Sequence, residues 1–91
     1  MIVGSLRVEL PLPESHSLKD RRAALNSLKE RLRGTFNVAV AEVEPNDTWQ
    51  RACLGVVCVG SEPAHVRRTL EDVSRWMRAD RAVAVIRIEQ E

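Results

Sequence analysis

The chain alternates between segments with a hydrophobic period of two and segments with a period of about 3.6 residues. Residues 2–10 carry apolar side chains at every second position from Leu6 to Leu10, which is typical of a half-buried strand. Two prolines then follow, at 11 and 13, and we expect them to end the strand because proline cannot donate to a sheet ladder. Further strands are predicted over 36–44, 52–59 and 82–89. Segment 52–59 is apolar on both faces, which favours a central strand.

Two helices are predicted between these strands. The first runs from about Leu18 to Arg33. Ser17 is its expected N-cap, Asp20 completes a capping box, and Gly34 is expected to supply a left-handed stop. The apolar stripe of this helix comprises Leu18, Ala24, Leu25, Leu28 and Leu32. The second helix opens at Ser61-Glu62-Pro63, and its buried stripe comprises Val66, Leu70, Val73 and Met77, with Trp76 on the flank.

The element order is therefore βαββαβ. Right-handed crossovers favour an α+β fold of the ferredoxin-like, split βαβ type, with an antiparallel four-stranded sheet in the order 4-1-3-2 and two helices on one face. Ninety-one residues suffice for one core, so residues 1–91 are expected to form a single ferredoxin-like domain.

The sheet face away from the helices is unusually apolar in this arrangement. It would carry Val3, Ser5, Arg7, Ala39, Ala41, Val43, Gly55, Val57, Val59, Val83 and Val85. Such a contiguous patch is better explained by burial against a second copy than by exposure to water. We expect a homodimer through this open sheet face; the alternative is a monomer with a tolerated apolar surface.

Composition and charge exclude several classes of protein. Apolar residues make up 44% of the chain and charged residues 30%, which is ordinary for a folded domain and argues against disorder. The net charge of +1 indicates no particular partner. No apolar run approaches the roughly 20 residues that span a bilayer, and no signal peptide is visible. A cytoplasmic location and no membrane partner are the resulting expectations.

Candidate chemistry is sparse. Cys53 and Cys58 lie five residues apart on a predicted strand, so they face opposite sides and are expected to be buried free thiols; an intermolecular disulfide is the alternative. His16 and His65 are isolated, so we expect no metal site and no cofactor. Catalysis is left open but unsupported, because no nucleophile with a base and no phosphate-binding glycine loop is present.

Cations gather instead on the first helix, which carries Lys19, Arg21, Arg22, Lys29, Arg31 and Arg33 against Asp20 and Glu30. They favour either a phosphate-tracking face or a solubilising surface whose arginines pair with Glu42, Glu44 or Asp47. Trp49 would stack on a base or anchor a partner, or else cap the core. The candidate binding residues are Lys19, Arg21, Arg22, Lys29, Arg33, Trp49 and Arg51. Base stacking on the sheet is not expected, because its two central strands lack aromatics.

Three motifs together resemble the YlxP-like family, a bacterial family of unknown function. They are Ser17-Leu18-Lys19-Asp20-Arg21-Arg22, Phe36-Asn37-Val38-Ala39-Val40-Ala41-Glu42-Val43 and Asp47-Thr48-Trp49-Gln50-Arg51-Ala52, and the likeness covers nearly the whole chain. Members typically carry Lys where Arg21 stands and Ser where Ala39 stands. The resemblance implies a ferredoxin-like fold and, through gene neighbourhoods shared with translation factors, a role near RNA or the ribosome. It implies no catalytic residues.

The leading hypothesis is a non-catalytic cytoplasmic dimer that binds RNA or a ribosomal component through the cations of the first helix. A small-molecule-binding or regulatory dimer, with a pocket at the subunit seam near Trp49 and Glu42, is the second. A protein-interaction module whose arginines form only salt bridges is the third. The hypotheses differ in whether Arg21 and Arg22 face Glu42 and Glu44 or lie in solvent beside Lys19.

Overall fold

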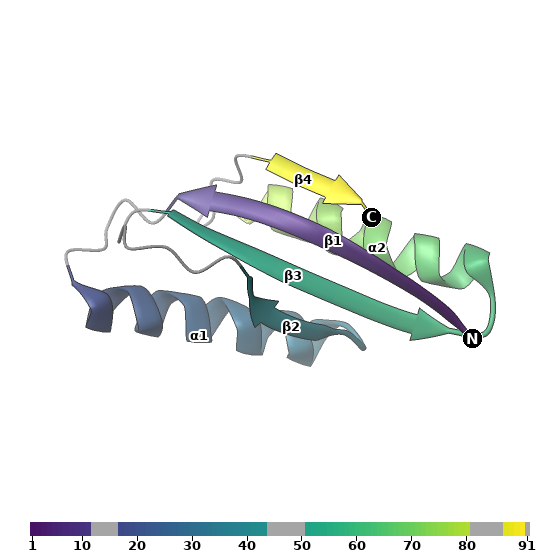
Figure 1. Ribbon diagram of the computed structural model, residues 1–91, viewed down its shortest axis with the longest axis horizontal. Helices are drawn as coiled ribbons and strands as arrows, with labels where there is room; N and C mark the ends of the chain where they lie inside the picture. Colours follow the sequence, from purple (N-terminus) through teal and green to yellow (C-terminus); the bar gives the residue numbers. More distant parts are fainter. Residues whose placement is uncertain (12–16, 44–50, 81–86, 91) are drawn as a thin grey trace.

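Two long strands, two helices and two short strands make up the part of the chain that the structure describes. The structure is a computed structural model, and it describes residues 1–11, 17–43, 51–80 and 87–90 (Figure 1). The elements are β1 (Ile2–Pro11), α1 (Leu18–Thr35), β2 (Ala39–Glu42), β3 (Arg51–Gly60), α2 (Pro63–Ala79) and β4 (Arg87–Gln90). The overall class is α+β, as predicted.

Strands β1 and β3 form the centre of the sheet. They pair antiparallel along their whole length, from Ile2 opposite Gly60 to Pro11 opposite Arg51. Strand β2 pairs with the other edge of β3, and the described residues of β4 pair with Leu6–Glu9 of β1. The resulting order is β2-β3-β1-β4, and all pairings are antiparallel. The apolar segment 52–59 is thus central, as its composition indicates.

The predicted four-stranded sheet needs correction. The antiparallel sheet that supplies the described core has three strands, β2, β3 and β1, and the described residues of β4 lie beside β1. Strand β2 is shorter than the predicted strand over 36–44, since its pairing with β3 begins at Ala39 and not at Phe36. Hydrophobic alternation extends further along the chain than backbone pairing does at β2, so it overestimates the length of that strand. Val83 and Val85 lie outside the described residues.

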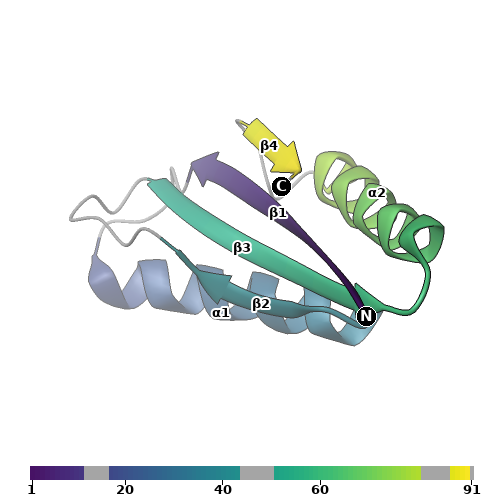
Figure 2. The same cartoon turned by 45° about the vertical axis from the view of Figure 1, so that its right-hand side comes forward.

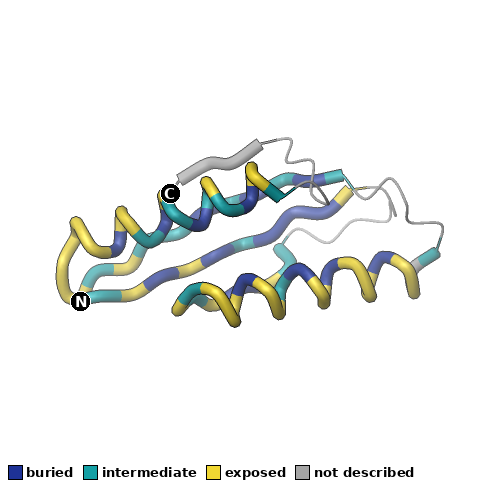
Figure 3. The backbone as a smooth tube through the Cα atoms, turned by 180° about the vertical axis from the view of Figure 1, so that it is seen from behind, coloured by how far each residue is buried: buried dark blue, intermediate teal, exposed yellow. Residues whose placement is uncertain are grey.

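Both helices lie on the same face of the sheet (Figures 1 and 2). Helix α1 packs below β2, whereas α2 packs against β1 and β3. Seen from behind, the buried segments of strands and helices face one another and the exposed segments of the helices face outward (Figure 3). The side chains that are almost completely buried include Val8, Leu10, Leu28, Leu32, Leu54, Val56, Leu70, Val73 and Met77. The predicted stripe of α2 is confirmed in full.

The sequence predicts the N-terminal end of α1 correctly but not its C-terminal end. The Ser17 side chain accepts a hydrogen bond from the Asp20 N–H at 3.1 Å, so the predicted N-cap is confirmed. The predicted glycine stop is wrong, because the helix continues through Gly34 to Thr35. The extended residue Phe36 is the C-cap, and its N–H donates to the Leu32 carbonyl at 2.9 Å. That bond satisfies a terminal carbonyl without a left-handed residue.

Candidate functional site

Arg21 is the one charged residue that is buried among the described residues, with 7% of its surface exposed. Its Nη2 donates to the Glu42 carboxylate at 2.5 Å and to the Arg51 carbonyl at 3.1 Å. Because Glu42 belongs to β2 and Arg51 to β3, this guanidinium joins helix α1 to two strands. Arg21 Nε is buried with no hydrogen-bond partner in the described part of the chain. Arg21 therefore faces the sheet and is not displayed to a ligand.

Arg22, the next residue, is exposed, as is Lys19. Two adjacent residues thus have opposite environments, because consecutive residues differ by about 100° around an α-helix. Arg21 pairs with Glu42, as expected for a module whose arginines form only salt bridges. Arg22 lies in solvent, as expected for a surface that binds RNA. Glu44, the other expected partner, lies outside the described residues.

A stripe of cations runs along one flank of α1. It consists of Lys19, Arg22, Lys29 and Arg33, hereafter the basic stripe. These positions follow steps of three and four residues once Asn26 is included, so they share one side of the helix. The stripe holds no carboxylate of its own, although Glu30 borders it. Lys19, Arg22 and Arg33 are exposed, and Lys29 is half-buried.

The C-terminal end of the basic stripe reaches the free edge of the sheet. Arg33 Nη2 donates to the Val40 carbonyl at 2.6 Å, and Val40 belongs to β2, which is the outer strand on this side. A charged group over an outer strand hinders pairing with another chain. Arg33 thus has a structural role, which leaves Lys19, Arg22 and Lys29 as the cations of the stripe to test for binding.

Arg31 lies on the opposite flank of α1, between the two helices. It donates to Asp80 Oδ2 at 2.6 Å, and its guanidinium lies 5.7 Å from the centre of the Trp76 ring. Trp76 also meets Phe36 edge to face at 6.1 Å. This arrangement ties the C-terminal ends of α1 and α2 together. Arg31 therefore does not extend the basic stripe.

The remaining candidates do not join the stripe. Arg51 is exposed, but its position on β3 alternates with the buried residues Ala52 and Leu54, which places it on the opposite face of the sheet from α1. Trp49 lies outside the described residues. The described candidate residues thus lie in three places. Arg21 is buried against the sheet, the basic stripe lies on a flank of α1, and Arg51 lies on the far face of the sheet.

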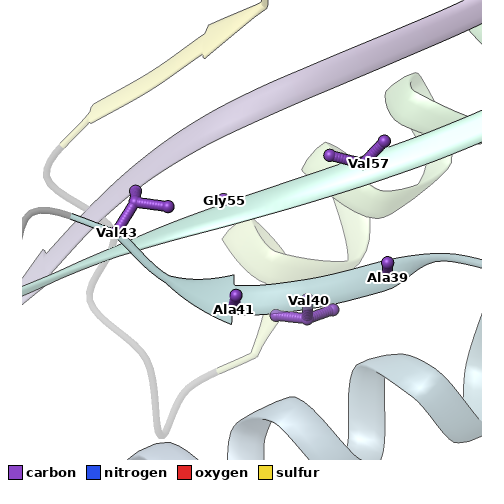
Figure 4. Close-up of a pocket in the computed structure, with 6 residues that line it drawn as sticks. All are labelled: Ala39, Val40, Ala41, Val43, Gly55 and Val57. Atoms are coloured by element: carbon purple, nitrogen blue, oxygen red, sulfur yellow. The ribbon is translucent and has the colours of Figure 1, made fainter.

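The open sheet face is the second surface of interest. We use this name for the face away from the helices, whose described apolar residues are Val3, Ala39, Ala41, Val43, Gly55, Val57 and Val59. A hollow of about 150 Å³ lies there between β2 and β3. Figure 4 shows Val43 and Val57 to either side of Gly55, with Ala39 and Ala41 on β2, whereas Val40 points to the other side of the strand.

Two features of these surfaces have no sequence signal of their own. The bond from Arg33 to Val40 depends on which strand is outermost, and the hollow depends on Gly55 and two alanines meeting across two strands. Periodicity places residues on faces, but it does not show which neighbours they meet. Cys53 and Cys58 are buried thiols that form no disulfide with each other, as predicted.

Within the described ranges, no three potential metal-binding side chains come together, and no helix is long and apolar enough to cross a membrane.

Neither the α+β fold nor the basic stripe identifies the family of this chain, but its similarity to known proteins does. Residues 3–90 match the family described as "Protein of unknown function (DUF503)", so the chain belongs to that family. The chain is also 32% identical over 72 residues to a protein of Bacillus subtilis (strain 168) called "Uncharacterized protein YlxP". That match covers 79% of this chain and 78% of the relative. The predicted resemblance is confirmed.

One similar solved structure is the "De novo designed protein Ferredog-Diesel". It is 15% identical, and the match covers 97% of this chain and 84% of the designed one with a TM-score of 0.43.

Proposed function

We propose that this protein is a non-catalytic cytoplasmic protein that binds RNA, free or within a ribosomal particle, through the basic stripe of α1. The observation that carries the proposal is the alignment of Lys19, Arg22 and Lys29 on one exposed or half-exposed flank, beside Arg33. Arg21 and Arg51, the other arginines among the candidates, are not part of this contact.

The dimensions of the stripe suit a phosphate backbone. From Lys19 to Arg33 it extends over about 21 Å, at 1.5 Å per residue. Cations spaced along a rigid helix neutralise successive phosphates and release their counterions, so binding is sequence-independent and weakens with salt. Base stacking on the sheet is not part of the proposal, because β1 and β3 contain no aromatic residue.

The test compares two triple variants with equal loss of charge. In the first, Lys19, Arg22 and Lys29 are changed to Ala; in the control, Arg67, Arg68 and Arg78, all exposed on α2, are changed to Ala. Binding to fluorescent single-stranded and duplex RNA is followed by anisotropy over a range of salt concentrations. Arg33 is kept, because it covers the β2 edge.

The stripe variant is expected to lose most of its RNA affinity, and its log–log salt slope on single strands should fall by about 2, at roughly 0.7 per phosphate contact. The control should retain both. Equal losses in the two variants would mean that only net charge matters, and wild-type protein with no measurable affinity would contradict the proposal. Thermal melts of both variants verify that they are folded.

A protein-interaction module is a second candidate. It is favoured by the engagement of Arg21 and Arg31 in ion pairs with Glu42 and Asp80. A small-molecule pocket near Glu42 gains less support. The Glu42 carboxylate is directed toward α1, whereas the hollow opens on the other side of the sheet and is lined by apolar residues. A wild-type protein with no measurable RNA affinity would favour the interaction module, whereas retained RNA binding in the stripe variant would place the RNA contact on another surface.

A further inference from the structure

We propose that the open sheet face is the interface of a symmetric homodimer, in which each copy lays the valines of its β3 over the hollow beside Gly55 of the other. This inference rests on the sheet and not on the basic stripe, so it stands or fails independently of RNA binding.

The large apolar side chains that are exposed in the described part of the chain gather on this face. Val3 is 58% exposed, Val59 53% and Val57 40%, and the chain terminus Met1 lies beside Val3. The register makes the valines neighbours, because Val3 pairs with Val59 across β1 and β3. Single exposed apolar residues are ordinary, but a contiguous group of them marks an interaction site.

The patch extends over the third strand as well. Ala39 of β2 lies opposite Val57, and Ala41 lies opposite Gly55. These small side chains, together with Gly55, leave the hollow of about 150 Å³, while Val57 and Val59 protrude next to it along β3. The face thus offers both a protrusion and a recess. An isologous dimer uses each of them twice, because a contact of residue i with residue j is repeated as a contact of j with i.

The charge pattern favours a second copy over a charged partner. Ser5 and Arg7 border the patch on this face of β1, directly opposite Val57 and Gly55, and Glu9 follows them along the strand. The face thus carries charges of both signs beside its apolar residues, so two copies related by a two-fold axis can place opposite charges near each other. An apolar centre with a polar border is the usual anatomy of a protein–protein interface.

The size of the face is adequate for a modest dimer. Three strands about 4.8 Å apart, two of them about 33 Å long and the four-residue β2 about 13 Å long, give a flat footprint of roughly 380 Å². Side-chain relief enlarges this area, but the face stays at the small end of the range, because each partner contributes roughly 800 Å² in a standard interface. Two twisted sheets pack face to face about 10 Å apart, which is close enough for valines to enter a recess. We therefore expect a reversible dimer.

The test is the molar mass in solution, measured by sedimentation equilibrium over a wide range of concentrations. The open-face variant carries Val57→Lys and Val59→Lys, and the control variant carries Ala23→Lys and Ala64→Lys, two exposed alanines on α1 and α2. Both variants add the same charge at exposed positions, so neither should disturb the core. Circular dichroism melts check that both are folded.

Wild-type and control proteins are expected to form dimers, and the open-face variant should remain monomeric, with a dissociation constant raised at least about tenfold. A wild-type protein that stays monomeric at every concentration would overturn the proposal, leaving the face to a different occupant. An open-face variant that still dimerises would move the interface elsewhere. Growth beyond two copies would contradict the symmetric closure of the interface.

Discussion

The two faces of the sheet are built from the same residue types but have opposite environments. On β3, Leu54 and Val56 are completely buried under the helices, whereas Val57 and Val59 are 40% and 53% exposed on the open sheet face. Valine is found on both sides, so hydrophobicity alone does not identify the core. The difference is that α1 and α2 both cover one face, and no helix or strand among the described residues covers the other.

The helix-covered face also admits a charge. Arg21 enters it at the β2 border, and its guanidinium is held by the Glu42 carboxylate and the Arg51 carbonyl. On an open surface, an ion pair of this kind contributes little. Under the helix, removal of one partner leaves the other charge poorly solvated.

Replacement of Arg21 is expected to have the largest effect. Arg21→Ala should lower the free energy of unfolding by about 3 kcal/mol. The reason is that the Glu42 carboxylate loses its ion-pair partner, and with it the ion pair that joins α1 to β2. Arg21→Lys should cost less, since it keeps a cation near Glu42. Urea denaturation measures both effects.

The matched control for this comparison is Arg22→Ala, one residue away and exposed. It should change the unfolding free energy by less than about 0.5 kcal/mol. Similar losses for the two alanine variants would show that Arg21 does not act as a buried clamp.

Adjacent valines on β3 give the most direct comparison of the two faces. Val56→Ala should cost about 2 kcal/mol in an unfolding experiment, because it removes two fully buried methyl groups and leaves a cavity. Val57→Ala, at low protein concentration where a dimer would dissociate, should cost less than about 0.5 kcal/mol. If Val57→Ala proves as costly as Val56→Ala under those conditions, the open face is covered within a single copy.

Two glycines sharpen the same contrast with a smaller effect. A Cβ on Gly4 would lie 2.7 Å from Val66 Cγ1 and 2.8 Å from Leu70 Cδ1, so Gly4→Ala should push α2 away from β1 and cost about 1 to 2 kcal/mol. A Cβ on Gly34 meets nothing within 4 Å. Because Gly34 lies inside α1, Gly34→Ala should stabilise the protein by about 0.5 to 1 kcal/mol. Thermal melts give both signs, and a tolerated Gly4→Ala would contradict the close packing of α2 on β1.

The sequence predicts correctly the features that a short stretch of chain determines. Ser17 caps α1, Val66 to Met77 form the stripe of α2, and β3 is central because both of its faces are apolar. The errors concern the end of α1 and the length of β2. Gly34 has the freedom to end a helix, but Phe36 caps α1 in an extended conformation, and β2 is shorter than its alternating pattern.

The candidate site shows the same division. Composition identified α1 as the basic element, and the Arg21–Glu42 pair was among the expected salt bridges. The roles of the individual cations were not predictable, because Arg21, Arg31 and Arg33 differ only in what lies opposite them: a strand carboxylate, the end of α2, or the carbonyl of an outer strand.

The sequence by itself determined the order of helices and strands, the α+β class, the family and the two faces of each strand, since these follow from local periodicity and from motifs. The tertiary structure alone decided how short β2 is, which of six cations on one helix are engaged, and where the sheet is hollow. Those properties depend on distant parts of the chain meeting in space. A sequence pattern shows which way a side chain points, and only packing shows what it meets there.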